Sequence, residues 1–353
     1  MPHPHEGSGA GRGPAGTVAT YLLRRLAGAV LLLLLVTLAV FAIFFLIPRA
    51  AGLSADDLAS RYVGKSADEQ QIHDIAVKLG LTDPFFVQYW HFLKGIVVGA
   101  DYSTGPTTVH CPAPCFGYSF LTQNPVLPDL LDRAPVTISL ALGAALIWLL
   151  FGIATGVLSA LRRGTAVDRS FMAVALAGVS LPIFFTGLLS LSVFSYTLHI
   201  FPPGGSYTPL TENPADWAYT LVLPWVTLAF LYAAAYARLT RAGMLETMNE
   251  DYVRTARAKG LPERTVITKH ALRSTLTPIL TIFGLDVGLL LGGAVLTETT
   301  FSLPGLGAYA YQAINTNDLP KLLGVTLVAA LFVIVANLVV DLLYAVVDPR
   351  VRV

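Results

Sequence analysis

Long apolar runs recur along the chain and alternate with shorter polar stretches. Six of these runs reach the roughly 20 residues that a helix needs to cross a bilayer core about 30 Å thick. None shows the alternation over about ten residues that marks a membrane barrel strand, and backbone amides in lipid must pair within their own segment. We therefore expect six transmembrane helices, at residues 26–47, 136–161, 171–198, 219–239, 276–297 and 322–347.

The composition supports an integral membrane protein of the all-α class. Of the 353 residues, 54% are hydrophobic and only 13% are charged, and the mean hydropathy is +0.65. A soluble domain of this length would carry about 25% charged residues. Apart from Arg238, Asp286 and Asp341, the charged residues lie outside the predicted helices.

Basic residues collect in alternate connections, which fixes an expected orientation. The connection 199–218 has no Lys or Arg, and 302–321 has only Lys321 at its border. Because basic residues favour the cytoplasmic side, both termini are expected inside and residues 48–135 outside. The basic residues that support this orientation are Arg12, Arg24, Arg25, Arg162, Arg163, Arg169, Arg238, Arg241, Arg254, Arg257, Lys259, Arg264, Lys269, Arg273, Arg350 and Arg352.

This orientation divides the chain into five parts. Residues 1–25 form a cytosolic tail, 26–47 the first span, 48–135 an extracytoplasmic loop that folds as a small cap, 136–348 the core domain, and 349–353 a second cytosolic tail. A cleaved signal peptide is the alternative for the first span. Its apolar core of about 22 residues exceeds the roughly 7–15 of a signal sequence, so we expect an uncleaved anchor.

The cap region contains the only two cysteines, Cys111 and Cys115. Outside the membrane a local disulfide between them is expected, with free thiols or a zinc site as alternatives. Residues 53–79 are expected to be helical. Residues 85–93 carry five aromatic side chains, which are expected to pack at the membrane interface more than to form a ligand site.

A short polar segment at 249–262 lies between the fourth and fifth spans. It favours a helix, it has small side chains near its middle, and it ends at a glycine, which stops a helix without steric cost. A short helix on the water face of a membrane protein offers a surface for another protein to bind. The residues expected to form this docking surface are Asp251, Tyr252, Arg254, Thr255, Ala256, Arg257, Ala258, Lys259 and Gly260.

Within the membrane, glycines and acids stand out in the last two spans. Gly284, Gly288 and Gly292 recur every four residues, which favours close helix packing, either inside this subunit or at a subunit interface. Asp286 is the most costly side chain to place in lipid. It is expected to line a pathway or interface, or to make a structural hydrogen bond to a neighbouring backbone group. Milder cases are Glu298, Asn337 and Asp341.

These motifs together resemble one known family. The segment 251–264 with 269–273 is similar to the cytoplasmic loop of binding-protein-dependent ABC transporter permeases of the dipeptide/oligopeptide branch. Residues 292–298, 301–307 and 337–344 extend the resemblance, which covers roughly four-fifths of the chain. Arg254, Thr255 and Ala256 replace the Glu-Ala-Ala that opens this loop in the wider family, while Ala256 and Gly260 keep its spacing.

The resemblance implies the type I ABC importer permease fold, with six transmembrane helices in a bacterial cell membrane and no catalytic site in this chain. It implies a homologous second permease, two cytosolic ATPases that bind ATP and Mg, and an extracytoplasmic substrate-binding lipoprotein. Lipid is the other expected partner, and nucleic acid is not. The segment 249–262 then becomes the coupling helix of a core permease domain.

The cargo and the energy source have alternatives. The same branch of permeases serves nickel complexes, glutathione and some oligosaccharides as well as peptides. A secondary transporter would need inverted repeats and paired intramembrane acids, and the two halves of this chain show no convincing similarity. A scaffold or receptor without transport would use the polar segment for docking alone.

Overall fold

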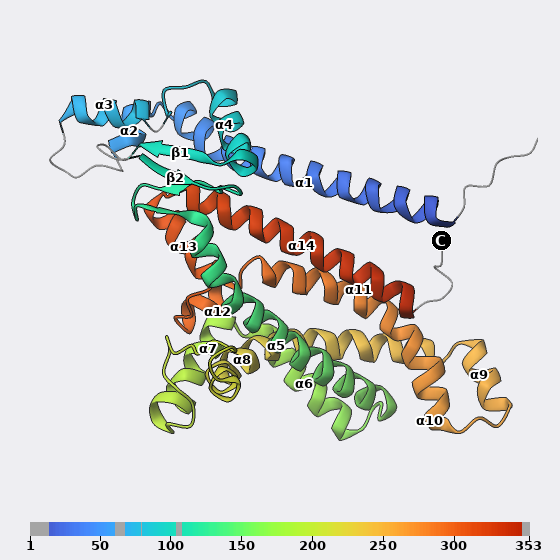
Figure 1. The fold of residues 1–353 in the computed structure, drawn as a ribbon. Helices are drawn as coiled ribbons and strands as arrows, with labels where there is room; N and C mark the ends of the chain where they lie inside the picture. Colours follow the sequence, from blue (N-terminus) through green and yellow to red (C-terminus); the bar gives the residue numbers. More distant parts are fainter. Residues whose placement is uncertain (1–13, 61–67, 79, 104–107, 348–353) are drawn as a thin grey trace, which may run out of the picture.

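The computed structural model describes the backbone of residues 14–60, 68–78, 80–103 and 108–347. The first 13 residues of the predicted N-terminal tail and all of residues 349–353 lie outside the described chain. For residues 14–25 only the backbone is described. The described chain is mostly helical, and its long helices run between a small cap at one end and a short helix, α9, at the other (Figure 1).

Five helices in the described chain are long and apolar enough to cross a membrane, and a bent helix pair makes a sixth candidate. The predicted all-α membrane fold is therefore confirmed. All five helices begin before the predicted borders, and α1 and α8 also end beyond them. The five are α1 (Pro14–Ala50), α5 (Val126–Leu161), α8 (Pro214–Thr247), α11 (Leu272–Leu291) and α14 (Leu319–Val347).

The third predicted span, 171–198, is wrong as a single helix. It consists of α6 (Ala166–Ser180), α7 (Ile183–Ser190) and the π-helical η2 (Leu191–Thr197), and α6 is bent by 103° from the other two. The bend falls at Leu181, which is extended with ψ 130°. Pro182 follows it, and a proline forces the residue before it out of the helical region.

The fifth predicted span, 276–297, is also interrupted. The segment begins with α10 (Glu263–Thr265) and η3 (Val266–Ala271), continues as α11, and stops at Leu291. Gly293 then takes a φ of +133°, where a side chain would meet the backbone of Gly307. The chain turns here into α12 (Val295–Thr300) and α13 (Leu306–Thr316), so Glu298 lies beyond the fifth span.

The centre of the bundle is the contact between α5 and α8. Gly152 lies against Tyr236 and Ala233, and Gly156 lies against Thr240 and Ala237. Side-chain-free positions let two helix backbones approach closely, so dispersion can hold them together in lipid. Trp148 is fully buried beside this seam and stacks on Tyr232 at 4.6 Å between ring centroids.

The cap is built from short elements between α1 and α5. The predicted helix 53–79 is two helices, α2 (Ala55–Ala59) and α3 (Glu69–Lys78), with residues 61–67 outside the described chain. The helix α4 (Phe85–Val98) follows. Two antiparallel pairs complete the cap, β1 (Ala100–Ser103) with β2 (Thr108–Cys111) and β3 (Tyr118–Ser119) with β4 (Asn124–Pro125).

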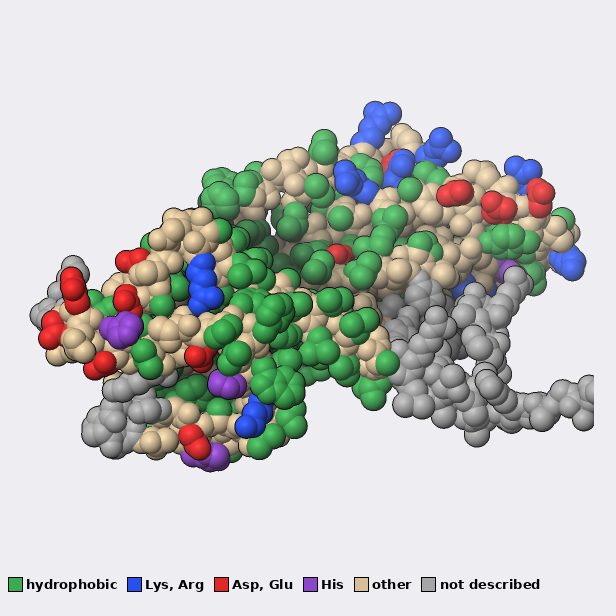
Figure 2. Space-filling model, turned by 90° about the horizontal axis from the view of Figure 1, so that it is seen from above, with side chains coloured by type: hydrophobic (Ala, Val, Ile, Leu, Met, Phe, Trp, Pro, Cys, Tyr) green, Lys and Arg blue, Asp and Glu red, His purple; other side chains and the backbone are tan. Residues whose placement is uncertain are grey.

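The surface changes character from one end to the other. Figure 2 shows hydrophobic side chains across the middle of one face, with most of the Lys and Arg side chains of that face toward the end away from the cap. A bilayer would cover the apolar middle and leave the two polar ends in water.

Candidate functional site: the α9 helix and the intramembrane acids

The predicted docking segment forms a separate short helix, α9 (Asp251–Ala258), at the end of the molecule opposite the cap (Figure 1). The chain enters it through Glu250, which is extended at φ −67° and ψ 147°. It leaves through Lys259 and Gly260, whose φ is +74°. This left-handed conformation is costly for any residue with a Cβ, so the glycine ends α9 and turns the chain toward α10.

One face of α9 is fixed to the rest of the subunit. Val253 and Ala256 are buried and form a small apolar cluster with Val266 of η3. The Tyr252 hydroxyl donates to the carbonyl of His270, also in η3, at 3.4 Å. Ala256 was expected on the docking surface, but its side chain is only 5% exposed, so it supports the helix from within.

The other face of α9 is open to solvent. Thr255 is exposed, and its hydroxyl donates to the Asp251 carbonyl within the helix at 2.8 Å. Ala258 adds a second small exposed side chain. A larger partner could approach the backbone closely at these two positions. The exposed residues among those predicted to dock are Asp251, Tyr252, Arg254, Thr255, Ala258, Lys259 and Gly260.

The two arginines of α9 differ in their partners. Arg257 donates to both carboxylate oxygens of Glu263, at 2.7 and 3.2 Å, and this bond raises the pKa of Arg257. Arg254 lies 3.7 Å from Asp251 in a looser pair, and both side chains are largely exposed. Arg257 therefore braces the turn after α9, whereas Arg254 can meet an acidic partner.

A buried acid near the same end was missed by the sequence analysis. Asp168, at the start of α6, accepts two hydrogen bonds from Arg241 of α8, both at 2.8 Å. It also accepts from the hydroxyl of Ser159 and from the backbone N–H of Gly164. These bonds join α5, α6 and α8. Its position three residues after the capping Thr165 was the available signal, since acids are common in a first helical turn.

Asp286 makes a side-chain hydrogen bond deep in the bundle. It is half-buried on α11 and accepts from the Tyr236 hydroxyl of α8 at 2.8 Å. The sequence analysis expected a backbone partner for such a bond, whereas the donor here is a tyrosine side chain. The bond links α11 to the α5–α8 core.

The glycines of α11 pack inside this subunit. Gly288 lies against Ala336 and Val333 of α14, and Gly292 lies against Ala329; Gly284 is buried as well. Asn337 lies half-buried on α14. Asp341 is on the same helix, with its side chain outside the described part of the chain.

Glu298 is fully buried and connects three helices. Its carboxylate accepts from the Thr137 hydroxyl of α5 at 2.7 Å and from the Ala308 N–H of α13 at 2.8 Å. Thr137 in turn accepts from the N–H of Leu306 at 2.8 Å. The arrangement satisfies a buried acid from both sides and positions the turn between α12 and α13.

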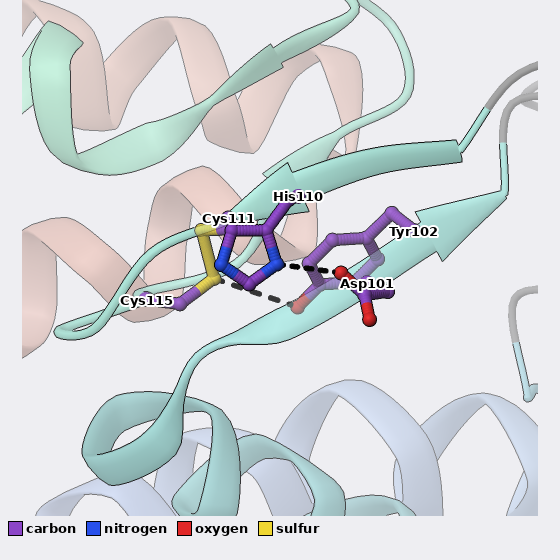
Figure 3. The surroundings of a disulfide bond; sticks show 5 residues. All are labelled: Asp101, Tyr102, His110, Cys111 and Cys115. Carbon is purple, nitrogen blue, oxygen red and sulfur yellow. Dashed lines mark hydrogen bonds and ion pairs between the residues drawn. A yellow bond between two sulfur atoms is a disulfide. The ribbon is translucent and has the colours of Figure 1, made fainter.

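In the cap, Cys111 and Cys115 form a disulfide at a sequence separation of 4 residues (Figure 3). Beside it, His110 and Asp101 pair across β1 and β2 at 2.6 Å, and Tyr102 lies near Cys115. Among the described residues no cluster of three or more His, Cys, Asp or Glu could hold a metal ion.

A cavity of about 790 Å³ separates the cap from the start of α14, and nothing in the sequence had indicated it. Its walls combine aromatic side chains of α1 and α4 with polar groups of α4 and of the β1–β2 pair. Its lining residues include Phe41, Phe45, Phe92, His91, Lys94 and Asp101.

Comparisons with known proteins cover nearly the whole chain. Residues 152–353 match the family described as binding-protein-dependent transport system inner membrane component, and residues 18–141 match the family of its N-terminal region. A putative peptide transport system permease protein of Brucella abortus is 38% identical over 331 residues, which cover 94% of this chain and 98% of the relative.

Two further relatives have more specific names. The dipeptide transport system permease protein DppB of Alkalihalophilus pseudofirmus is 35% identical over 357 residues, covering 94% of this chain and 99% of the relative. The di/tripeptide transport system permease protein DppB of Pseudomonas aeruginosa is 37% identical over 353 residues, covering 94% and 98%.

Proposed function

The chain belongs to the family of binding-protein-dependent transport system inner membrane components, and from this premise we propose that it forms, with a homologous second permease, the path by which di- and oligopeptides cross the membrane. It is a multi-pass permease subunit of a peptide ABC transporter, and it is not itself an enzyme. Two partner ATPases bind ATP and Mg and drive the cycle, and an extracytoplasmic lipoprotein delivers the peptide to the cap end.

The helix α9 is the coupling helix in this proposal. The supporting observation is its two-faced geometry: Thr255, Ala258 and Arg254 are exposed, while Val253 and Ala256 are anchored on Val266. A partner ATPase can therefore grip the outer face while the inner face stays attached to the subunit. A helix held in this way can pass a movement of the ATPase to the rest of the subunit.

The attachment defines where a movement of α9 would go. Val266 belongs to η3, which continues directly into α11. Helix α11 packs on α14 through Gly288 and Gly292 and is bonded to α8 through Asp286 and Tyr236. ATP-driven closure of the ATPases would pull α9, tilt α11 and move its neighbours. We place Asp286 beside the path that this movement opens, because it is a half-buried acid on the moving helix.

A thiol-directed photo-crosslinking experiment tests the docking assignment. The only two cysteines are already joined in a disulfide, so Thr255→Cys or Ala258→Cys would introduce a single free thiol. We expect crosslinker attached at either position to capture a partner ATPase in the assembled transporter. Ala256→Cys is the matched control, since its buried side chain should neither react nor crosslink.

Reconstituted uptake tests the transport assignment. The purified transporter in vesicles, with its binding protein, should accumulate a labelled dipeptide only when ATP and Mg are supplied on the α9 side. Uptake that follows an ion gradient without ATP would favour a secondary transporter. Failure of α9 to crosslink, with ATP-dependent uptake intact, would refute the docking assignment alone.

A further inference from the structure

The helix α4 carries a stripe of large apolar side chains that no other described part of the chain covers. Phe86, Trp90 and Val97 are 76%, 63% and 75% exposed. Their spacing of four and then seven residues places them on one face of the helix. A contiguous exposed patch of this kind marks a surface that another apolar phase covers.

The other two sides of α4 are already in use. Phe85, Tyr89 and Phe92 pack on Phe41 of α1, with ring centroids 5.5 to 6.0 Å away. His91 and Lys94 lie on a second side and line the cavity between cap and core. The apolar stripe therefore points away from both the subunit core and the polar cavity.

Contacts with α1 fix the depth at which α4 lies. Phe45 packs in one cluster with Leu323, near the start of α14. Phe41 lies one helical turn deeper, about 6 Å further along α1. The Tyr89 hydroxyl reaches deeper still, to the Leu34 carbonyl at 2.9 Å and the Thr37 hydroxyl at 3.0 Å.

The α1 surface at this depth is apolar, and the described chain leaves much of it uncovered. Helix α1 is the most apolar of the candidate spans, and only 17% of its most apolar window is buried inside the subunit. Leu35, Ile43 and Ile47 are about half exposed along it. In Figure 1, α4 lies beside the part of α1 nearest the cap, whereas α3 projects past the end of α1. The α4 stripe therefore lies beside the exposed apolar surface of a candidate membrane span.

We propose that α4 is immersed in the cap-side leaflet of the membrane, with Phe86, Trp90 and Val97 in contact with lipid acyl chains. The helix anchors the cap to the bilayer and holds the polar side, with His91 and Lys94, toward the cavity. The apolar face of an amphipathic helix of this type lies roughly 5–10 Å inside the headgroup boundary. The contact between α4 and Phe41, one helical turn deeper than Phe45, agrees with such a depth. Tryptophan is enriched at that level.

Depth-dependent fluorescence quenching tests this proposal on the intact protein. The chain has four tryptophans, and Trp90 is strongly exposed whereas Trp148 and Trp225 are 0% and 8% exposed. The transporter, purified with the subunits that accompany it, is reconstituted in phosphatidylcholine vesicles with bromine on the acyl chains. We expect Trp90→Phe to abolish most of the bromine-dependent quenching. The matched control Trp148→Phe should leave that quenching unchanged, and aqueous iodide should spare Trp90.

If water or protein covers the stripe instead of lipid, the quenching pattern differs. If iodide quenches Trp90 while brominated lipid does not, α4 lies in water and the proposal fails. If neither quencher reaches Trp90, a protein surface covers the stripe, whether the binding protein, the second permease or another copy, and the proposal fails as well. Circular dichroism of each variant confirms that the helices are retained, so a negative result is interpretable.

Discussion

At the scale of single residues, Glu298 explains the two glycines at the start of α13. Gly305 and Gly307 lie directly against its carboxylate, and a Cβ at Gly305 would collide with both carboxylate oxygens. The acid is fully buried and bonded to Thr137 and Ala308. It therefore cannot swing away to make room.

Gly305→Ala should accordingly destabilise the protein by about 1–3 kcal/mol, the usual cost of overpacking a filled interior. The φ of Gly305 is −91°, so the loss would come from the collision and not from the backbone. Thermal unfolding in detergent measures it. Gly28→Ala is the control, because no atom lies within 4 Å of the added Cβ. Equal stability of the two variants would contradict this reading of Glu298.

Gly260 offers a second test at one residue. Its positive φ should make Gly260→Val strained by about 1–2 kcal/mol, which would displace the end of α9 and uncouple ATP hydrolysis from uptake. Gly164→Val is closely matched, since Gly164 has a φ of +80° and both sites have open space around an added Cβ. We expect both variants to insert normally. Stimulated ATPase activity should fall only in the Gly260 variant, and an equal fall in both would contradict the assignment of α9 as the coupling helix.

At the scale of elements, the sequence predicts helices well where apolar length decides. Helices α1, α5, α8 and α14 were found because their apolar runs are long. The breaks at Pro182 and Gly293 were missed because the surrounding residues remain apolar. Hydropathy gives the length of an apolar segment but not whether its backbone changes direction. Pro182 could have signalled its break, since a proline constrains the residue before it.

The candidate site was predicted only in part for a similar reason. Polarity placed α9 correctly, but the sequence could not tell its inner face from its outer face. Val253 and Ala256 are inside because Val266 lies across the turn. The role of Arg257 was likewise set by Glu263, six residues away in the chain and within 2.7 Å in space.

The two arginines of α9 therefore lead to opposite expectations. Arg254→Gln should weaken the binding of the partner ATPase roughly three- to tenfold, about 0.7–1.4 kcal/mol, with the loss shrinking at high salt. Arg257→Gln should leave that affinity nearly unchanged and cost the turn about 0.2–1 kcal/mol, because an exposed ion pair stabilises little. Binding to the ATPase by biolayer interferometry in nanodiscs separates them, and a larger loss for Arg257→Gln would reverse the assignment.

At the scale of the whole molecule, a buried polar network joins the cap to the core. Asp318, between α13 and α14, is fully buried and accepts from the Ser119 hydroxyl of β3 at 2.5 Å. Lys321 lies 3.4 Å from the same carboxylate and 5.3 Å from the Tyr309 ring. The Tyr309 hydroxyl donates to Asp129 of α5 at 2.8 Å.

This network could not be predicted from the sequence. Asp318 and Lys321 fall in a connection that reads as solvent-exposed loop, and Ser119 lies 199 residues away from Asp318. Only the folded cap brings the three groups together and removes them from water. A charged loop residue in a membrane protein is thus uninformative about burial until its distant neighbours are known.

Ser119→Ala should loosen the whole cap and not only its own strand. Asp318 would keep Lys321 alone, and its other carboxylate oxygen already lacks a hydrogen-bond partner among the described residues, so the loss should be about 1–3 kcal/mol. Hydrogen exchange should then rise in β3, in α4 and at the start of α14 together. Ser54→Ala is the comparison, because it removes the exposed cap of α2 and should raise exchange there only. If Ser119→Ala also acted only within its own strand, the network would be a local contact, and α4 with its lipid-facing stripe would be what holds the cap in place.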